Sequence, residues 1–293
     1  MSKGIFKSEN KKREIINFYN KILKRWPVNY EEITINTKYG DTHILLSGNK
    51  DNPPLVLIHG SASNSAMWIG DIENYVKYFR VYMIDIPGEP GKSQELRFDI
   101  ETSESAKWLD NIISELNIKM FCLGGISFGG WIAVDYSVKN PGKVEKLFLL
   151  CPAGIGKQKT KYIPYLVFMA LLGQYGSKKV LEKICYGEEI DQEALYFNHL
   201  ISKGFNPRMK KFPIFEDKQL RSLTMKTCLI LGKKDIVFDS EDTLKRAINN
   251  IPNLNYEMLL DKGHGLINKS KQIIDFLLDE AYSEQCEKEA IIK

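Results

Sequence analysis

The sequence has no strong charge bias, no long apolar run and no paired-cysteine motif. Its 41 basic residues nearly balance 37 acidic ones, which gives a formal net charge of +4 over 293 residues. So small an excess argues against a nucleic-acid-binding surface. The longest apolar stretch, YIPYLVFMALLG at 162–173, contains a proline and is too short to span a bilayer, so we expect no stable membrane insertion.

Cysteines and metal-ligand spacings are also sparse. The five cysteines are scattered, odd in number and without a CxxC pair, which favours free thiols in a reducing cytoplasm over a zinc site. The first twenty residues are highly charged and lack the apolar centre of an export signal, so we expect a cytoplasmic protein. We expect neither a metal nor a cofactor, and the sequence does not indicate an oligomeric state.

What the chain does contain is an alternation of short apolar runs and helical patterns. The first two runs form a predicted hairpin, and continuous apolar runs separated by helices indicate a parallel sheet covered on both faces. We therefore predict an α/β fold with a mostly parallel eight-stranded sheet. The predicted strands are 31–37, 41–48, 54–60, 80–86, 120–125, 146–151, 227–232 and 255–260.

The alternation is interrupted once, at about 152–222. This segment is aromatic, helical in pattern and without a convincing strand, which predicts a helical insertion after the sixth strand. The predicted core then comprises 1–151 and 223–293. An amphipathic helix at about 12–26 precedes the hairpin, and we expect it to pack on the edge of the sheet.

A glycine-rich junction follows the fifth predicted strand. GISFG at 125–129 matches G-x-S-x-G, a sharp strand-to-helix turn that projects a nucleophilic serine. Small residues two before and two after Ser127 prevent collisions in so tight a turn. The alternative is a glycine-rich turn whose serine only caps the helix.

Partners for Ser127 can be sought at the same edge of the sheet. Of the four histidines, His264 follows the last predicted strand, where its loop lies on the same edge as the serine. Asp235 follows the seventh strand and can orient this base. Asp239 and Asp261 are alternatives, although Asp239 better suits the cap of the next helix. The plainer interpretations are a solvated loop carboxylate for Asp235 and, for His264, a loop histidine that caps the helix after it.

An oxyanion hole needs two backbone N–H groups. Phe128 offers one at the start of the helix after the serine, and Ser61, in LVLIHGSASN, offers the second. These small residues could instead make only a tight loop. Two other motifs are discounted: PGEPGKS lacks the first glycine of a phosphate-binding loop, and the basic cluster at 208–211 is interpreted as a solvated loop.

Five segments carry a resemblance to a known superfamily. They are HGSASNSAMW (59–68), DIPGEPGKS (85–93), GISFGG (125–130), GKKD (232–235) and GHG (263–265). In this order they resemble the α/β-hydrolase superfamily over about residues 30 to 280. Together with YNKILKRWPV, TKYGDTHILLSG and PPLVLIHGSASNSAMW, they resemble the small bacterial carboxylesterases of the naproxen-esterase type. The loop usually written D-x-P-G-x-G-x-S is one residue longer here.

The resemblance implies a helical cap after the sixth strand and an acid after the seventh, which match 152–222 and Asp235. We expect the cap to line the substrate pocket with Phe168 and Met169. The predicted function is a serine hydrolase that cleaves small carboxylic esters through an acyl-enzyme. A C–C hydrolase of vinylogous diketones, or a lactonase, would use the same triad. A silent ligand-binding homologue is the alternative from another class.

Overall fold

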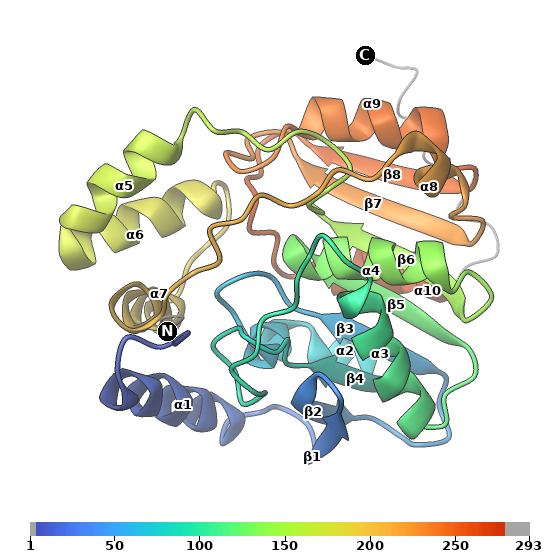
Figure 1. The fold of residues 1–293 in the computed structure, drawn as a ribbon, viewed down its shortest axis with the longest axis horizontal. Helices are drawn as coiled ribbons and strands as arrows, with labels where there is room; N and C mark the ends of the chain where they lie inside the picture. Colours follow the sequence, from blue (N-terminus) through green and yellow to red (C-terminus); the bar gives the residue numbers. More distant parts are fainter. Residues whose placement is uncertain (1–3, 279–293) are drawn as a thin grey trace.

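An eight-stranded sheet forms the centre of the protein (Figure 1), whose computed structural model describes residues 4–278 apart from the side chains at 163, 166, 167 and 170. The strands are β1 (Tyr30–Thr37), β2 (Gly40–Ser47), β3 (Pro54–Ile58), β4 (Arg80–Ile84), β5 (Phe121–Ile126), β6 (Val144–Leu150), β7 (Lys226–Gly232) and β8 (Leu254–Leu259). Their order is β1-β2-β4-β3-β5-β6-β7-β8. Only the pairings of β2 are antiparallel, so the predicted mostly parallel sheet is confirmed.

Helices cover both faces of this sheet, which is why the central strands are continuous apolar runs. Side chains of α3, α4 and α9 pack into one apolar cluster with the sheet, and those of α2 and α10 pack into a second cluster on the opposite face. These helices are α2 (Ile72–Tyr75), α3 (Glu104–Glu115), α4 (Phe128–Lys139), α9 (Ser240–Asn250) and α10 (Ser270–Leu278). The short 3-10 helix η1 (Ser65–Gly70) precedes α2 and adds Trp68 to the second cluster.

Four helices lie between β6 and β7, in the range expected to form a cap. They are α5 (Ile163–Leu171), α6 (Gly173–Ile184), α7 (Gln192–Gly204) and α8 (Asp217–Arg221). The first three form a layer beside the sheet (Figure 1), in which the Lys183 ammonium lies 4.5 Å from the Tyr165 ring centre. Helix α8 instead packs on α9, where Arg221 donates to Asn250 over 2.8 Å. The range 152–222 therefore contains both the separate layer and a helix that packs on the core.

The N-terminal helix α1 (Glu9–Leu23) begins and ends before the expected limits of 12 and 26. The Ser8 hydroxyl accepts a hydrogen bond from the Lys11 N–H, so this serine caps the helix and sets its start. Helix α1 reaches the core through Tyr19, but it also packs on α7, where the rings of Phe18 and Phe197 stack 5.9 Å apart. It therefore joins the inserted layer to the core rather than lying on the sheet edge alone.

The loops that follow the parallel strands meet at one edge of the sheet, because parallel strands end on the same side. Loops after β3, β4, β5, β7 and β8 therefore lie close together, and they carry the candidate residues described below. Among the described helices, none has the length and apolar character needed to cross a bilayer.

Candidate active site

The turn between β5 and α4 holds Ser127 in a strained conformation. Its backbone angles are φ 55° and ψ −113°, a region that residues other than glycine rarely adopt. The turn requires small neighbours: a Cβ on Gly125 would lie 2.4 Å from the Gly129 carbonyl carbon, and one on Gly129 would lie 2.1 Å from the Ile58 oxygen. This geometry explains the glycines on both sides of the serine.

Three predicted residues form a hydrogen-bonded chain in which His264 contacts both of the others. His264 Nε2 lies 2.9 Å from Ser127 Oγ, and His264 Nδ1 lies 2.7 Å from Asp235 Oδ2. The serine follows β5, the aspartate follows β7 and the histidine follows β8, so three distant segments meet. All three are buried, and Ser127 keeps the most exposure at 9%. The arrangement can move a proton from the serine hydroxyl to the histidine.

Asp235 is held as a carboxylate that orients the histidine. Its second oxygen, Oδ1, accepts hydrogen bonds from the N–H groups of Val237 and Phe238, at 2.6 and 3.0 Å. Burial acts to raise the pKa of Asp235, but the charge and hydrogen bond of His264 and these two donors outweigh it, so the pKa is lowered. The carboxylate therefore stays ionised and can stabilise a protonated His264. Asp239, the alternative acid, caps α9 instead.

Phe128 and Ser61, the predicted oxyanion donors, lie near the serine in different ways. Phe128 is the first residue of α4, so its N–H has no carbonyl partner within the helix. Gly60 lies against the serine, because a Cβ placed on it would be 3.5 Å from the Ser127 Cβ. The peptide that joins Gly60 to Ser61 therefore lies beside the candidate nucleophile.

A buried histidine orients that peptide. His59 Nδ1 lies 2.8 Å from the Gly60 carbonyl oxygen, and its Nε2 lies 2.9 Å from the Ile86 nitrogen. A carbonyl can only accept and an amide can only donate, so the ring is neutral with its proton on Nδ1. Burial lowers the pKa of His59 and favours this state. Since the Gly60 carbonyl points at the ring, the Ser61 N–H of the same planar peptide points away from it.

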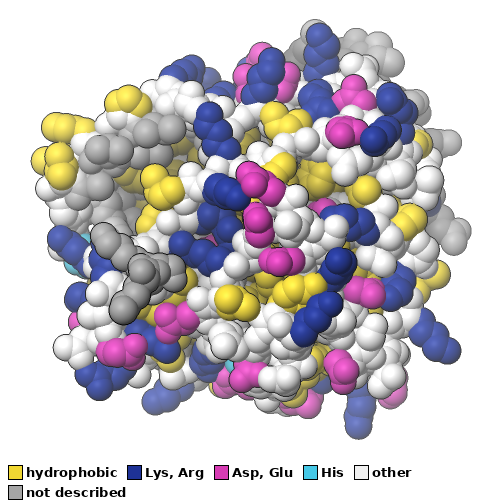
Figure 2. Space-filling view, viewed as in Figure 1, with side chains coloured by type: hydrophobic (Ala, Val, Ile, Leu, Met, Phe, Trp, Pro, Cys, Tyr) yellow, Lys and Arg dark blue, Asp and Glu magenta, His cyan; other side chains and the backbone are white. Residues whose placement is uncertain are grey.

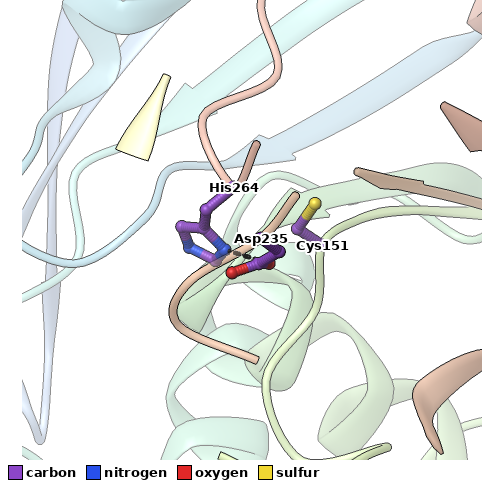
Figure 3. Close-up of side chains that lie close together, drawn as sticks. All are labelled: Cys151, Asp235 and His264. Atoms are coloured by element: carbon purple, nitrogen blue, oxygen red, sulfur yellow. Dashed lines mark hydrogen bonds and ion pairs between the residues drawn. The ribbon is translucent and has the colours of Figure 1, made fainter. Parts of the chain in front are cut away.

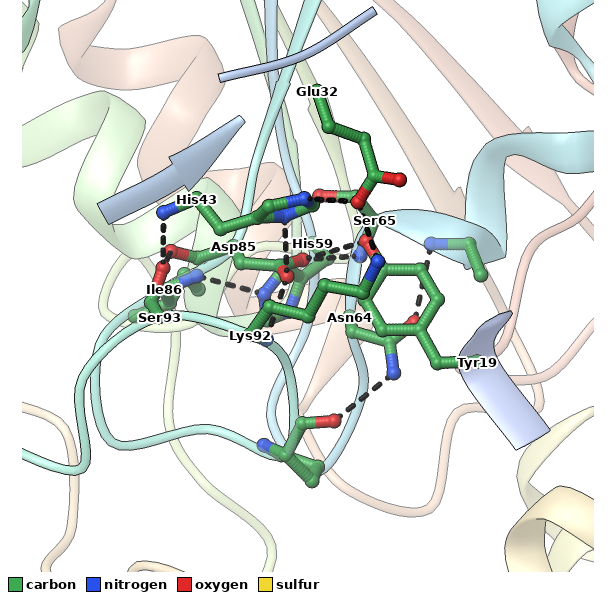
Figure 4. Close-up of polar contacts among 12 residues, drawn as sticks. Tyr19, Glu32, His43, His59, Asn64, Ser65, Asp85, Ile86, Lys92 and Ser93 are labelled. Atoms are coloured by element: carbon green, nitrogen blue, oxygen red, sulfur yellow. Dashed lines mark hydrogen bonds and ion pairs between the residues drawn. The ribbon is translucent and has the colours of Figure 1, made fainter. Parts of the chain in front are cut away.

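Asp85 anchors the adjoining loops (Figure 4). Its Oδ1 accepts from the Ser65 N–H at 2.8 Å, and its Oδ2 accepts from the Lys92 N–H at 2.9 Å and contacts His43 Nδ1 at 3.0 Å. Burial acts to raise the pKa of Asp85, but His43 and the backbone donors outweigh it and the pKa is lowered. This carboxylate therefore fixes the loop that follows Ser61.

Cys151, one of the cysteines expected to be free thiols, lies beside Asp235 on the side away from His264 (Figure 3). Its sulfur, an Asp235 oxygen and a His264 nitrogen lie within 4.8 Å of one another, a grouping that could ligate a metal. However, the 2.7 Å contact between His264 and Asp235 already uses two of these atoms, and burial raises the pKa of the Cys151 thiol. His264 and Asp235 therefore fit a proton relay with Ser127 better than a metal site, and Cys151 stays a protonated thiol beside them.

The residues expected to line the substrate pocket lie on α5. Phe168 is 56% exposed and Met169 is partly buried. Figure 2 shows hydrophobic side chains at the outer end of the inserted layer, where Leu171 and Tyr175 are also exposed. The role of Phe168 and Met169 in substrate binding stays a prediction.

The sheet order and the serine turn at its carboxyl edge define an α/β-hydrolase fold. The alpha/beta hydrolase fold family matches residues 53–180. A Bacillus subtilis protein described as the uncharacterized carboxylesterase nap is 30% identical over 85% of this chain and 85% of its own length. The chain belongs to the α/β-hydrolase family.

Two further relatives support this assignment. Carboxylesterase YbfK of Bacillus subtilis is 27% identical over 84% of this chain and 86% of its own. The crystal structure of naproxen esterase from the same species is 26% identical, with a TM-score of 0.80 over 92% of this chain and 99% of that one. The likeness therefore includes the inserted layer as well as the core.

Proposed function

We infer that this protein is a serine hydrolase that cleaves small carboxylic esters through an acyl-enzyme. The observation that carries this inference is the hydrogen-bonded chain from Ser127 through His264 to Asp235. The carboxylesterase names of the relatives support an ester as the substrate. The contacts among these three side chains support a hydrolase over a silent ligand-binding homologue, which would not need them.

In the first half of the reaction, Ser127 Oγ attacks the ester carbonyl while His264 Nε2 takes its proton. Asp235 holds the histidine tautomer and stabilises the imidazolium that forms. The N–H groups of Ser61 and Phe128 would stabilise the oxyanion of the tetrahedral intermediate. His264 then gives its proton to the leaving alcohol, and the acyl group remains on the serine.

In the second half, water replaces the alcohol. His264 takes a proton from the water as it attacks the acyl-serine, and the same oxyanion donors act again. Collapse of the second tetrahedral intermediate returns the proton to Ser127 Oγ and releases the carboxylic acid. Apart from the ester and water, both halves use only groups of this chain.

The test combines active-site labelling with turnover. A fluorophosphonate should label Ser127, and Ser127→Ala should abolish labelling and lower hydrolysis of p-nitrophenyl butyrate by a factor on the order of 10⁶. Ser202→Ala is the matched control, because Ser202 is exposed on α7 and its hydroxyl donates to the His199 carbonyl of the same helix. Retention of more than a few per cent of activity in purified Ser127→Ala would rule out this nucleophile. Absence of labelling and turnover in the parent would favour a binding protein.

A further inference from the structure

A buried glutamate lies in the loop at 85–93, which follows β4. Glu89 is 1% exposed, and its Oε2 accepts a 2.6 Å hydrogen bond from the Ala62 N–H. Its Oε1 has no hydrogen-bond partner among the described residues. An unpaired buried acceptor is energetically costly. The presence of Glu89 Oε1 next to the loop of Ser61 and Ala62 therefore requires an explanation.

A second polar side chain with unpaired atoms approaches from the inserted segment. Arg208 Nη1 donates to the Phe98 carbonyl over 3.0 Å, but its Nε and Nη2 are buried and have no partner within the described chain. These two nitrogens point to the same side of the guanidinium and form the fork that binds a carboxylate through two parallel hydrogen bonds. The cluster at 208–211, interpreted from sequence as a solvated loop, therefore contains a half-buried arginine.

The two side chains border the predicted oxyanion hole. Glu89 accepts a hydrogen bond from Ala62, the residue after Ser61, and the Arg208 guanidinium lies 5.3 Å from the ring centre of Phe128. Arg97 joins the two segments that carry them, because it donates to the carbonyls of Gly88 and Asn206. Figure 2 shows basic side chains in the middle of this face, between the inserted layer and the core.

The charges around this position favour an anion. Arg97 and Arg208 both lie near Glu89, and Asp99, the other acid that affects Arg208, is paired with Lys210 at 3.2 Å. Burial raises the pKa of Glu89 to about 7, so near neutral pH this acid is partly uncharged. An uncharged Glu89 could also donate a hydrogen bond from Oε1.

We propose that Arg208 and Glu89 form a carboxylate-binding subsite beside the oxyanion hole, and that the substrates are esters which carry a second, free carboxylate. This proposal deepens the proposed function and rests on it. The free carboxylate would accept two hydrogen bonds from the Arg208 fork, and a third from Glu89 Oε1 when that acid is protonated. A half-ester of a dicarboxylic acid has this chemistry. The competing explanation is that the fork serves only Glu89, as an internal ion pair.

The experiment compares two matched series of esters on the full-length protein. One series contains monoethyl esters of linear dicarboxylic acids, and the other contains ethyl esters of linear monocarboxylic acids of equal chain length. For at least one length, we expect kcat/KM to be about tenfold or more higher for the half-ester, as charge-assisted hydrogen bonds imply. The matching free dicarboxylate should inhibit competitively.

Variants of Arg208 test whether its fork of Nε and Nη2 causes the preference for half-esters. Arg208→Met keeps the length but not the donors, so the half-ester to neutral-ester ratio should fall to about one. Arg208→Lys keeps the charge without the fork and should give an intermediate ratio. Lys211→Met is the matched control, because Lys211 is an exposed lysine of the same basic cluster. Its ratio should equal that of the parent.

Several results would overturn the subsite. Equal kcat/KM for both series at every chain length would do so, as would an identical ratio in the parent and Arg208→Met. Lower melting temperatures in Arg208→Met and Glu89→Gln without any change in ratio would identify an internal ion pair. If Arg208→Met does not fold, the test rests on two other measurements. An unchanged ratio in Arg208→Lys, together with no inhibition of the parent by the dicarboxylate, would overturn the subsite. Failure of the proposed function would look different from failure of the subsite. In that case neither series would be cleaved, and the phosphonate would not label Ser127.

Discussion

Two buried histidine–aspartate pairs in this protein have nearly the same internal geometry. His264 Nδ1 lies 2.7 Å from Asp235, and His43 Nδ1 lies 3.0 Å from Asp85. The pairs differ in what the other ring nitrogen contacts. His264 Nε2 lies 2.9 Å from Ser127 Oγ, whereas His43 Nε2 lies 2.8 Å from a carboxylate oxygen of Glu32.

The difference teaches that a His–Asp pair is not in itself a catalytic feature. His43 lies within β2 between two carboxylates, so its ring joins β1, β2 and the loop after β4. His264 lies in a loop at the carboxyl edge of the sheet and contacts a strained serine. The first pair is suited to stabilising the fold, and the second is suited to moving a proton.

Of the changes that separate the two pairs, the largest effect should come from breaking the contact between His264 and Asp235. Asp235→Asn keeps the size of the side chain but favours the wrong histidine tautomer, so kcat should fall by a factor of about 10⁴. Ester hydrolysis by the purified variant, with its melting temperature, measures this effect. A loss below about tenfold would show that Asp235 does not orient the base.

Two carboxyl groups of one loop should respond to pH in opposite directions. The pKa of Asp85 is lowered, so its stabilisation is present above its ordinary value near 3.8 and is lost as the pH falls below it. Burial raises the pKa of Glu89 from 4.5 to about 7, so its contribution is largest below 4.5 and is lost as the pH rises through 7.

Glu89→Gln should therefore stabilise the protein at high pH relative to low pH. Between about pH 5 and pH 8, the unfolding free energy of the variant should rise relative to the parent by roughly 2 to 3 kcal/mol. Urea unfolding of both proteins at the two pH values measures this change. A constant difference across that range would mean that Glu89 titrates as it does in the unfolded chain.

A smaller effect is expected at the structural pair. His43→Gln removes a ring that bonds to buried Asp85, so the unfolding free energy should fall by about 2 kcal/mol, the usual size for a hydrogen bond to a charged group. Because His43 is not part of the triad, kcat of the folded variant should stay within a few-fold of the parent. A loss of kcat comparable to that of Asp235→Asn would contradict the division between the two pairs.

The smallest effect should come from the inserted layer. If Met169 lines the acyl pocket, Met169→Ala should change the dependence of kcat/KM on ester chain length by about 0.8 kcal/mol per methylene, or roughly fourfold per carbon. Leu171→Ala is the control, because Leu171 is 79% exposed at the end of the same helix. Identical chain-length profiles in the two variants would remove Met169 from the pocket.

Much of the candidate site was accessible from sequence because its residues follow strands. Apolar runs identify the strands, and parallel strands end at one edge, so Ser127, Asp235 and His264 could be placed together without any contact information. The start of α1 and the surface on which it packs were less predictable. Its start depends on the Ser8 cap, and its packing on α7 depends on helices that lie far away in sequence.

The sequence by itself determined the order of strands and helices, the tight serine turn and the residues at the edge of the sheet. Periodicity, glycine positions and chain order are local properties, and they suffice where the fold brings strand ends together. Only the tertiary structure decided that His43 pairs with Glu32 and that Arg208 lies against the ring of Phe128. Burial and unpaired hydrogen-bond groups depend on packing between distant segments, which no local pattern records.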